Sequence, residues 1–373
     1  MPRPEPTASS PRITVVFLLY HAARVAPDLV AGLARQVHAK YSRQAEWLEA
    51  LWMDDASSDG TSRAVETALA ALGNPAHYRL VANPENLGLA GTLNKALGLV
   101  RTPFMLTCHL DCRFGSEDYV ASMLELIDRN PRAAAITGQP VVARDAPPPF
   151  AEKLNVVTNL MDIFPSESAD ALVPVGFAEG RCDVFRVEAL RAAGFYDTRL
   201  RVAGEDQVLA ARLRQLGYEI YQAPRLAYQL SVSGEQDTVR KLLGHQRLFG
   251  RAHPYIMVRV RGTRSGVFGQ RAGSNRTSRG VLRASQVASS AAYVLVVVAW
   301  LAGAPAWLWA SILALVLLAK VVLFGRHLRA ARLTALELVA FVLLQPALDV
   351  SYTVGLAEGL WHLLLGDARE PIA

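Results

Sequence analysis

Two long apolar stretches toward the C-terminus constrain what this chain can fold into. Residues 284–324 contain a single charged side chain, Lys320. A bilayer-spanning helix needs roughly 20 mostly apolar residues, and this stretch has about twice that length, with a break that contains Gly and Pro at 302–307. Because neither half has a polar face, we expect a helical hairpin inserted in a membrane rather than a buried pair of soluble helices.

The second stretch, residues 335–365, is less uniform. It contains four residues that membrane helices usually avoid: Gln345, Pro346, Asp349 and Glu358. Polar groups inside a membrane are costly unless they are paired or lie near its edge. The segment can therefore span the membrane, re-enter it or lie at the interface. The two stretches together predict an α-helical transmembrane region of two to three helices over residues 284–365.

A basic segment precedes the hairpin. Residues 240–283 include eleven Lys or Arg residues and no Asp or Glu. Basic segments beside membrane helices stay on the cytoplasmic side and are drawn to anionic lipids, so we predict a juxtamembrane, interfacial segment over residues 239–283. Such a patch can also bind nucleic acid, but the adjoining hairpin favours the membrane, and we expect no nucleic-acid partner.

The cysteines and the N-terminus indicate a cytoplasmic location. Cys108, Cys112 and Cys182 provide no disulfide framework, which fits a reducing compartment. Residues 1–12 have neither the apolar core nor the cleavage site of a signal peptide, and we expect a disordered lead. The sequence thus predicts an integral membrane protein whose soluble part faces the cytoplasm.

The region between residues 13 and 129 alternates between short apolar runs and helical patterns. The apolar runs are typical of strands buried on both faces, and they lie at 13–20, 46–53, 78–84 and 103–110. Helical patterns follow at 27–40, 61–72, 89–100 and 116–129. This alternation predicts an α/β fold with a mainly parallel sheet and helices on both sides. Ligands bind beyond the carboxyl ends of the strands in such sheets.

Polar segments follow three of these strands, at the edge where a ligand is expected. They read DDASSDGT at 54–61, NPENLG at 83–88 and HLDCRF at 109–114. Helix capping explains part of the first segment, and the second can be an ordinary turn. Adjacent aspartates at a strand end repel each other unless a ligand or cation uses them. Three such segments on one edge indicate a binding site.

These segments resemble those of the family 2 inverting glycosyltransferases, which have a GT-A fold, a Rossmann-like nucleotide-sugar-binding domain. The resemblance covers roughly residues 13–260 and includes a fourth block, GFYDTRLRVAGEDQVLAARLRQLGYEI, at 194–220. The residues that reproduce the family's pattern there are Gly194, Phe195, Glu205, Asp206, Gly217 and Tyr218. The resemblance implies a GT-A catalytic domain, which we place at residues 13–238.

The resemblance implies roles for individual residues. An inverting transferase needs a base that deprotonates the acceptor hydroxyl, and the matching position is Asp206, with Glu205 beside it. Two acids at a helix start are also favoured by the helix dipole alone. For the nucleotide-sugar donor, with a UDP-sugar favoured, the matching positions are Asp54 or Asp55, and we prefer Asp55. The block NLGLAGTLNKAL at 86–97, which overlaps the second segment, adds Asn86, Gly88 and Asn94.

The leaving diphosphate needs a divalent cation or basic side chains to neutralise its charge. Family members usually provide an Asp-any-Asp motif for Mn²⁺ or Mg²⁺ at the end of the fourth strand. Here Asp111 matches the second aspartate and His109 replaces the first. In an alternative register Asp111 is the first aspartate and Arg113 replaces the second. His and Asp are both acceptable ligands for such a cation.

The segment after the base helix, residues 242–254, faintly resembles one that family members use near the diphosphate. It supplies Arg247 and Arg251 as candidate donor-binding residues and His245 as a candidate third metal ligand. An amphipathic basic helix on the membrane explains the arginines equally well. The segment lacks the Q-any-any-R-W signature of processive synthases.

Acceptor recognition in this fold usually involves the region between residues 140 and 180, where Glu179 and neighbouring Arg181 are the candidates. Since membrane helices would hold the site at the bilayer, we predict transfer of a single sugar to a lipid-linked or membrane-embedded acceptor at the cytoplasmic face. Two alternatives remain. One is a processive polysaccharide synthase, and the other is a degenerate transferase, missing one metal aspartate, that binds nucleotide or lipid as a scaffold.

Overall fold

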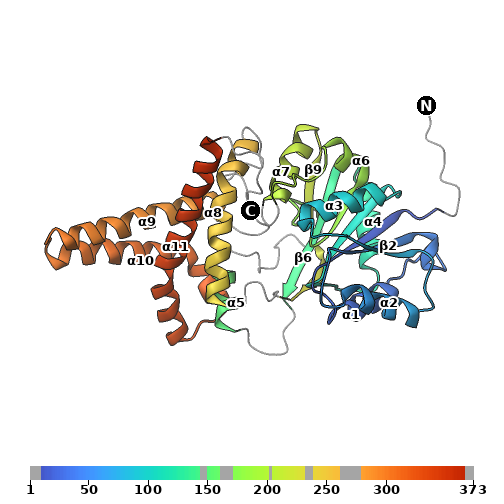
Figure 1. Ribbon diagram of the computed structural model, residues 1–373, viewed down its shortest axis with the longest axis horizontal. Helices are drawn as coiled ribbons and strands as arrows, with labels where there is room; N and C mark the ends of the chain where they lie inside the picture. Colours follow the sequence, from blue (N-terminus) through green and yellow to red (C-terminus); the bar gives the residue numbers. More distant parts are fainter. Residues whose placement is uncertain are drawn as a thin grey trace. The chain divides into compact units, whose positions relative to one another are not determined.

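The computed structural model describes residues 10–142, 149–159, 171–200, 204–231, 238–260 and 279–365. The chain forms two compact units. The first comprises Met1–Ala143 and Pro165–Ser231, and the second comprises Arg144–Phe164 and Val232–Ala373. Within the described residues the first unit is α/β and the second is helical (Figure 1).

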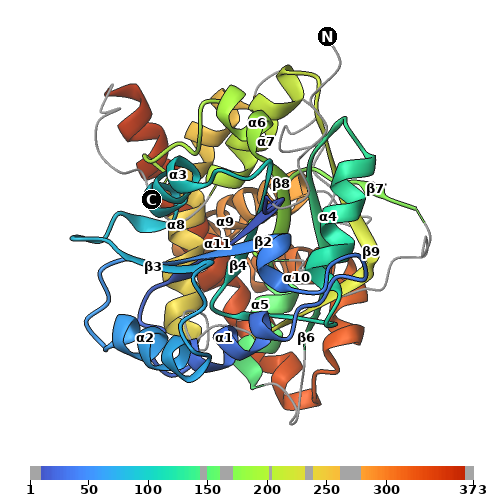
Figure 2. The same ribbon diagram turned by 90° about the vertical axis from the view of Figure 1, so that its right-hand side faces the viewer.

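Four parallel strands form one half of the sheet in the first unit, in the order β3-β2-β1-β4. Their bounds are Ile13–Leu19 for β1, Leu48–Asp54 for β2, Tyr78–Ala82 for β3 and Phe104–His109 for β4. Helices cover the sheet on both sides (Figure 2). They are α1 Ala26–Ala34, α2 Thr61–Ala71, α3 Gly88–Leu99 and α4 Tyr119–Arg129. The predicted strand–helix alternation is confirmed.

Two predicted boundaries differ from the structure for local reasons. The first helix ends at Ala34 rather than near residue 40, and Gln36 then anchors the chain to the start of α4. Its side chain donates to the Ser116 carbonyl at 2.9 Å and accepts from the Val120 N–H at 3.0 Å. The second strand begins later than predicted because Gln44–Glu46 forms a 3₁₀ turn.

The other half of the sheet is mixed, and the apolar patterns do not predict it. It consists of β8 Cys182–Arg186, β6 Ala133–Val142, β9 Glu219–Leu230, β5 Cys112–Phe114 and the short β7 Val173–Pro174. β8 runs antiparallel between β4 and β6, whereas β6 and β9 are parallel. Since β8 is antiparallel to β4, the residues that precede β8 lie beside the end of β4. Two helices, α6 Val187–Ala192 and α7 Glu205–Gln215, complete the unit.

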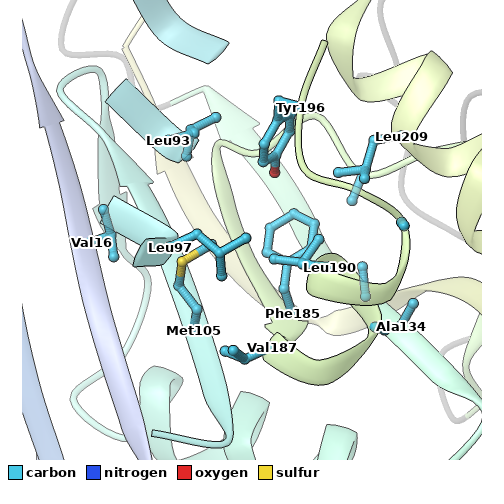
Figure 3. Packing of buried hydrophobic residues seen from close by; sticks show 14 of the residues in the cluster. Val16, Leu93, Leu97, Met105, Ala134, Phe185, Val187, Leu190, Tyr196 and Leu209 are labelled. Carbon is cyan, nitrogen blue, oxygen red and sulfur yellow. The ribbon is translucent and has the colours of Figure 1, made fainter. Parts of the chain in front are cut away.

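One buried cluster packs α3, α6 and α7 against a single face of the sheet (Figure 3). It joins strand residues to helix residues that include Val16, Met105, Phe185, Leu93, Leu97, Leu190 and Leu209. Tyr196, from the loop between α6 and α7, belongs to the same cluster. This packing positions the start of α7 near the sheet edge that carries the polar segments.

The second unit contains five described helices. They are α5 Phe150–Thr158, α8 Val239–Arg259, α9 Arg279–Leu301, α10 Ala306–Ala331 and α11 Ala335–Leu364. By length and composition α9, α10 and α11 are able to cross a membrane. α9 and α10 form the predicted hairpin (Figure 1). α5 packs in this unit although the predicted catalytic domain continues through it, and Lys153 of α5 pairs with Glu337 of α11 at 2.9 Å.

α8 and α11 pack closely because glycines line their contact. Gly355 and Gly359, four residues apart on α11, face the backbone carbonyls of Arg247 and Arg251, and a Cβ at either glycine would clash with them. Gly250 of α8 faces α11 in the same way. Small residues at this spacing allow helix backbones to approach each other.

Several polar residues of the apolar stretches are paired, whereas the buried Gln345 amide has no partner among the described residues. Lys320 of α10 and Asp349 of α11 form an ion pair at 2.9 Å, and their side chains are 3% and 1% exposed. Tyr293 of α9 donates to Asp349 at 3.3 Å, and Ser290 bonds Thr353 at 2.9 Å. Pairing of this kind offsets the cost of polar groups in an apolar environment.

Candidate active site

Asp54 ends β2 and organises the turn that follows it. Its carboxylate accepts hydrogen bonds from the Ser57 N–H at 3.0 Å and from the Ser62 hydroxyl in the first turn of α2. Asp59, in the same turn, accepts from both the N–H and the hydroxyl of Thr61. Asp54 is buried. Turn formation and helix capping therefore account for much of this segment.

Asp55 organises the neighbouring loop. One oxygen of its carboxylate accepts from the Asn83 side chain and from the Leu87 N–H, both at 2.8 Å. Lys95 of α3 donates to the side-chain oxygen Oδ1 of Asn83 at 2.7 Å. The buried Asp55 thus fixes the loop after β3 against the end of β2.

Asn86, Gly88 and Asn94 have different local roles. The Asn86 side chain accepts from the Gly88 N–H at 3.0 Å, and Gly88 has φ +71°, which glycine adopts without strain. Asn94 donates to the Tyr196 carbonyl at 2.9 Å and accepts from the Tyr196 N–H at 2.8 Å. Asn94 therefore links α3 to the loop before α7, whereas Asn86 has its side chain exposed at the edge of the sheet.

The end of β4 brings the predicted metal residues and the predicted acceptor residues together. His109 ends β4, and Asp111 follows in the turn to β5. Arg181, just before β8, lies 3.5 Å from Asp111 and 3.0 Å from Glu179 in ion pairs. The Arg181 carbonyl also accepts the His109 N–H at 2.8 Å. These four residues form one cluster.

Burial and charge in this cluster favour a neutral His109 imidazole and a charged Arg181 guanidinium. The Nε2 atom of His109 is enclosed and has no hydrogen-bond partner among the described residues. Burial lowers the pKa of the His109 imidazole, and a neutral imidazole can offer a ring nitrogen to a cation. Burial alone would lower the pKa of Arg181, but Glu179 and Asp111 raise it above its usual value. Arg181 therefore stays charged.

Glu205 and Asp206 begin α7, directly after Gly204 with φ +91°. Their environments differ. Glu205 is 6% exposed, and its Oε2 atom has no partner in the part of the chain that the structure describes. Burial, followed by the charge of Asp206, raises the pKa of Glu205 to about 8. Glu205 therefore holds a proton more readily than an ordinary glutamate, and the partly exposed Asp206 is the more accessible acid of the pair.

Two buried polar residues near this pair are not identified by the sequence analysis. Asp183 of β8 accepts from the Gly180 N–H at 2.7 Å, while its Oδ1 has no partner among described residues, and burial raises its pKa to about 6. The buried Tyr196 hydroxyl likewise finds no partner in the described ranges. Burial, then Glu205 and Asp183, raise the pKa of Tyr196. The only sequence signal is that both residues lie within or close to motif blocks.

Charge interactions connect the end of β4 with the start of α7. Glu179 interacts with His109 and Arg181 on one side, and with Asp183 and Glu205 on the other. The candidate active site thus consists of the turn after β4, the residues before β8 and the N-terminus of α7.

The remaining predicted residues lie on α8, in the second unit. Arg247 pairs with Glu358 of α11, with its Nε 3.1 Å from each carboxylate oxygen. The His245 ring packs edge-on against Phe249, with 4.7 Å between centroids. The Nε atom of Arg251 is buried and has no partner within the described residues. The roles of these three residues at the diphosphate and the cation stay predictions.

Comparison with protein-family models matches residues 14–194 to Glycosyl transferase family 2. These residues, just under half of the chain, are similar to a family 2 glycosyltransferase domain. The match contains the polar segments after β2, β3 and β4, together with Glu179, Arg181 and Asp183. No curated protein sequence matches the chain.

One solved structure supports the predicted fold. Mannosyltransferase PcManGT from Pyrobaculum calidifontis, in complex with GDP-Man and Mn²⁺, has a TM-score of 0.62 at 19% identity, covering 96% of this chain and 89% of that one. GalNAc-T7 with UDP, GalNAc and Mn²⁺ has a TM-score of 0.47 at 12% identity, covering 68% and 52%. The first similarity, at this low identity, supports the GT-A fold and nothing further. The predicted fold class is confirmed.

The glycosyltransferase site offers a partial set of metal ligands. Within the described ranges, no group of three or more His, Cys, Asp or Glu residues is arranged to hold a metal ion. Asp111 and the enclosed Nε2 of His109 are two suitable donors for Mn²⁺ or Mg²⁺. Arg113, the alternative second position, donates to the carbonyls of Leu110 and Cys112 at 3.0 and 2.8 Å. The residues fit a cation that takes its other ligands from the donor diphosphate.

Proposed function

We propose that the protein is a membrane-anchored inverting glycosyltransferase. It moves a single sugar from a nucleotide sugar, with a UDP-sugar favoured, to a lipid-linked or membrane-embedded acceptor at the cytoplasmic face. The observation that carries this proposal is the contrast between the two acids of α7. Glu205 is enclosed and burial raises its pKa, whereas Asp206 is partly exposed. An inverting transfer needs one such accessible base.

In the proposed reaction Asp206 takes the proton of the acceptor hydroxyl while that oxygen forms a bond to the anomeric carbon. The bond from this carbon to the diphosphate oxygen breaks on the opposite face, and the nucleoside diphosphate leaves with the electron pair. A divalent cation would neutralise the charge that develops on the diphosphate, and His109 and Asp111 would hold it. Arg181, which stays charged beside Asp111, adds positive charge to the same place.

Glu179 is our candidate for positioning the acceptor. It interacts with His109 near the proposed cation and with Glu205 near the proposed base. A hydroxyl group held by Glu179 would therefore lie between the two halves of the reaction. The membrane and the cytoplasmic side are supported by the apolar hairpin, the basic segment before it and the three buried free cysteines.

The test is release of nucleoside diphosphate by the purified protein. The panel contains UDP- and GDP-sugars, the latter because PcManGT was solved with GDP-Man and Mn²⁺, together with Mn²⁺ or Mg²⁺ and membrane lipids. We expect release that depends on both donor and lipid. The Asp206→Asn variant should be slower by about 10²–10⁴-fold because it lacks the base.

Glu188→Gln is the matched control for Asp206→Asn. Glu188 is an exposed acid in the first turn of α6, so its variant removes a similar charge from a similar helix position and should keep the full rate. Full activity of Asp206→Asn, or no release with any donor, would contradict the proposal. The mass of the product separates a single transfer from a processive synthase, and nucleotide binding without turnover would favour a scaffold.

A further inference from the structure

α11 is the apolar helix whose relation to the membrane the sequence leaves open. Its 30 residues make a helix about 45 Å long, at 1.5 Å per residue. Within the second unit, α11 and α8 run crosswise to the hairpin of α9 and α10 (Figure 1). Two crosswise elements cannot both follow the bilayer normal. Either the hairpin enters the membrane and α11 lies along it, or the reverse holds.

The polar side of α11 is turned toward the protein. Its acidic residues are each ion-paired with another helix of the unit: Glu337 with Lys153, Asp349 with Lys320 and Glu358 with Arg247. Every residue of α11 that is exposed is apolar. The acidic side chains of the helix therefore contact the protein, and its exposed side chains are apolar.

The apolar face is continuous along the helix. It is formed by residues that recur every three or four positions or their multiples and are 42–79% exposed: Leu336, Val339, Leu343, Val350, Val354 and Trp361. This period places them on one side of the helix from end to end, whereas Leu338 and Leu363, exposed near the two ends, lie off this side. The glycines that pack on α8, Gly355 and Gly359, lie on roughly the opposite side.

The direction of this face follows from the position of α8. Figure 1 shows α8 on the side of α11 away from the hairpin tip. Because the apolar face lies opposite α8, it points the same way as the hairpin projects. The hairpin is apolar on all sides, for example at Val298, Leu315 and Val322, which are 54%, 68% and 75% exposed. A helix pair of this kind belongs inside the hydrocarbon.

We propose that α11 lies along one leaflet of the membrane, with its apolar face on the acyl chains, and does not cross the bilayer. Only the hairpin penetrates the hydrocarbon, and α8 lies on the headgroup side of α11. Since a hairpin begins and ends on one side, the residues after α11 stay on the same side as the residues before α9. The inference rests on the proposed insertion of the hairpin and adds the orientation of α11.

The opposite arrangement is disfavoured by the same observations. If α11 crossed the bilayer, the hairpin would lie in the membrane plane, and some of its exposed apolar residues would face headgroups and water. The apolar face of α11 would then contact acyl chains along its whole length, but one side of the apolar hairpin would no longer contact them. Inserting the hairpin into the hydrocarbon while the apolar face of α11 lies along one leaflet avoids that cost.

The first experiment determines the side of the C-terminus. Single cysteines Ser10→Cys and Ala373→Cys are tested with a membrane-impermeant maleimide on intact cells and on inverted vesicles. The native cysteines are buried, so the unsubstituted protein gives the background. We expect both variants to react in inverted vesicles and not in intact cells. Reaction of Ala373→Cys only in intact cells would show that α11 crosses and would overturn the proposal.

The second experiment measures depth and does not depend on reagent access from one side. Spin labels at Leu336→Cys, Leu343→Cys, Val350→Cys and Trp361→Cys are compared in lipid vesicles by their accessibility to oxygen and to a water-soluble nickel complex. An in-plane helix gives nearly equal depths. A crossing helix spreads the first and last labels over about 37 Å, at 1.5 Å per residue, and that spread would overturn the proposal.

Alkaline carbonate extraction separates this inference from the proposed insertion of the hairpin. Release of the protein by carbonate would refute insertion itself, and the inference would fall with it. Retention in the membrane with equal label depths supports both. Retention with depths that spread along α11 leaves the membrane anchor in place and refutes only the in-plane orientation.

Discussion

Buried polar groups are hydrogen-bonded on one side of the candidate site, whereas several on the other side lack partners among the described residues. On the donor side, the carboxylates of Asp54 and Asp55 accept hydrogen bonds that build the loops after β2 and β3. On the acid side, four enclosed atoms lack partners among the described residues: His109 Nε2, Asp183 Oδ1, Tyr196 Oη and Glu205 Oε2. An unpaired buried polar group costs about 1–3 kcal/mol. A protein keeps several of them together where a ligand or a reaction uses them.

Similar acidic motifs in one domain therefore have different roles. The DD motif after β2 is largely satisfied within the protein and contributes to stability. In the ED motif of α7, the Glu205 Oε2 atom has no partner among the described residues, and the partly exposed Asp206 lies beside it. Substitutions on the two sides should therefore change stability in opposite directions.

The largest stability effect should come from Asp55→Ala. The variant leaves the Asn83 amide and the Leu87 N–H without their acceptor in a buried place. We expect the free energy of unfolding to fall by about 2–4 kcal/mol, since each unpaired group costs about 1–3 kcal/mol. Denaturant unfolding in detergent measures it, with Asp28→Ala, an exposed acid in the first turn of α1, as the control. A decrease in the free energy of unfolding of less than about 1 kcal/mol would show that Asp55 contributes little to stability, and would contradict the contrast between the two sides.

Glu205→Gln should have the opposite sign, and the effect should depend on pH. The pKa of Glu205 is raised from 4.5 to about 8 in the folded protein. The folded state therefore binds this proton more tightly than the unfolded state, and wild type loses stability as pH rises from about 4.5 through about 8. The variant has no such proton to lose.

We therefore expect Glu205→Gln to match wild type near pH 4.5 and to exceed its stability at pH 8.5, by on the order of 2–4 kcal/mol. Unfolding measured at both pH values checks this, and the exposed Glu188→Gln should show no such trend. If Glu205→Gln is less stable than wild type at pH 8.5, the Glu205 carboxyl stabilises the fold. That result would contradict the contrast between Asp55 and Glu205.

The smallest effect should come from His109→Asp. If His109 shares a cation with Asp111, the variant restores an Asp-any-Asp motif, and Mn²⁺-dependent release of nucleoside diphosphate should persist or rise a few-fold. Titration of the rate with Mn²⁺ measures this, with His21→Asp, an exposed residue after β1, as the control. Loss of folding instead would make His109 a structural strand end only.

The parallel half of the sheet could be predicted because its strands are mostly apolar runs, interrupted only by single charged residues such as Glu49 and Arg79. The mixed half could not, since its strands contain residues that strands usually avoid. β6 includes three alanines, Gly138 and Pro140, and β9 includes Pro224. Gly138 is required there because a Cβ would clash with the Tyr119 hydroxyl, a close approach that becomes visible only in three dimensions.

The same limit applies to the candidate site. The spacing of the motif blocks points to Glu205 and Asp206, but their different protonation depends on burial by elements distant in sequence. Asn94 illustrates this dependence, since its amide bonds the backbone of Tyr196, 102 residues away. Asp183 and Tyr196 acquire their unusual environment only when β8 and α7 come together. The roles of the donor, metal and acceptor residues stay predictions for the experiments above.

The central claim is that Asp206 acts as the single base of an inverting displacement. Proton NMR of the purified glycoside product tests it most directly, because the coupling constant of the anomeric proton gives the configuration of the new bond. An α-linked nucleotide sugar should yield a β-linked product. A product that keeps the α configuration would contradict the claim, because one direct displacement cannot retain the configuration.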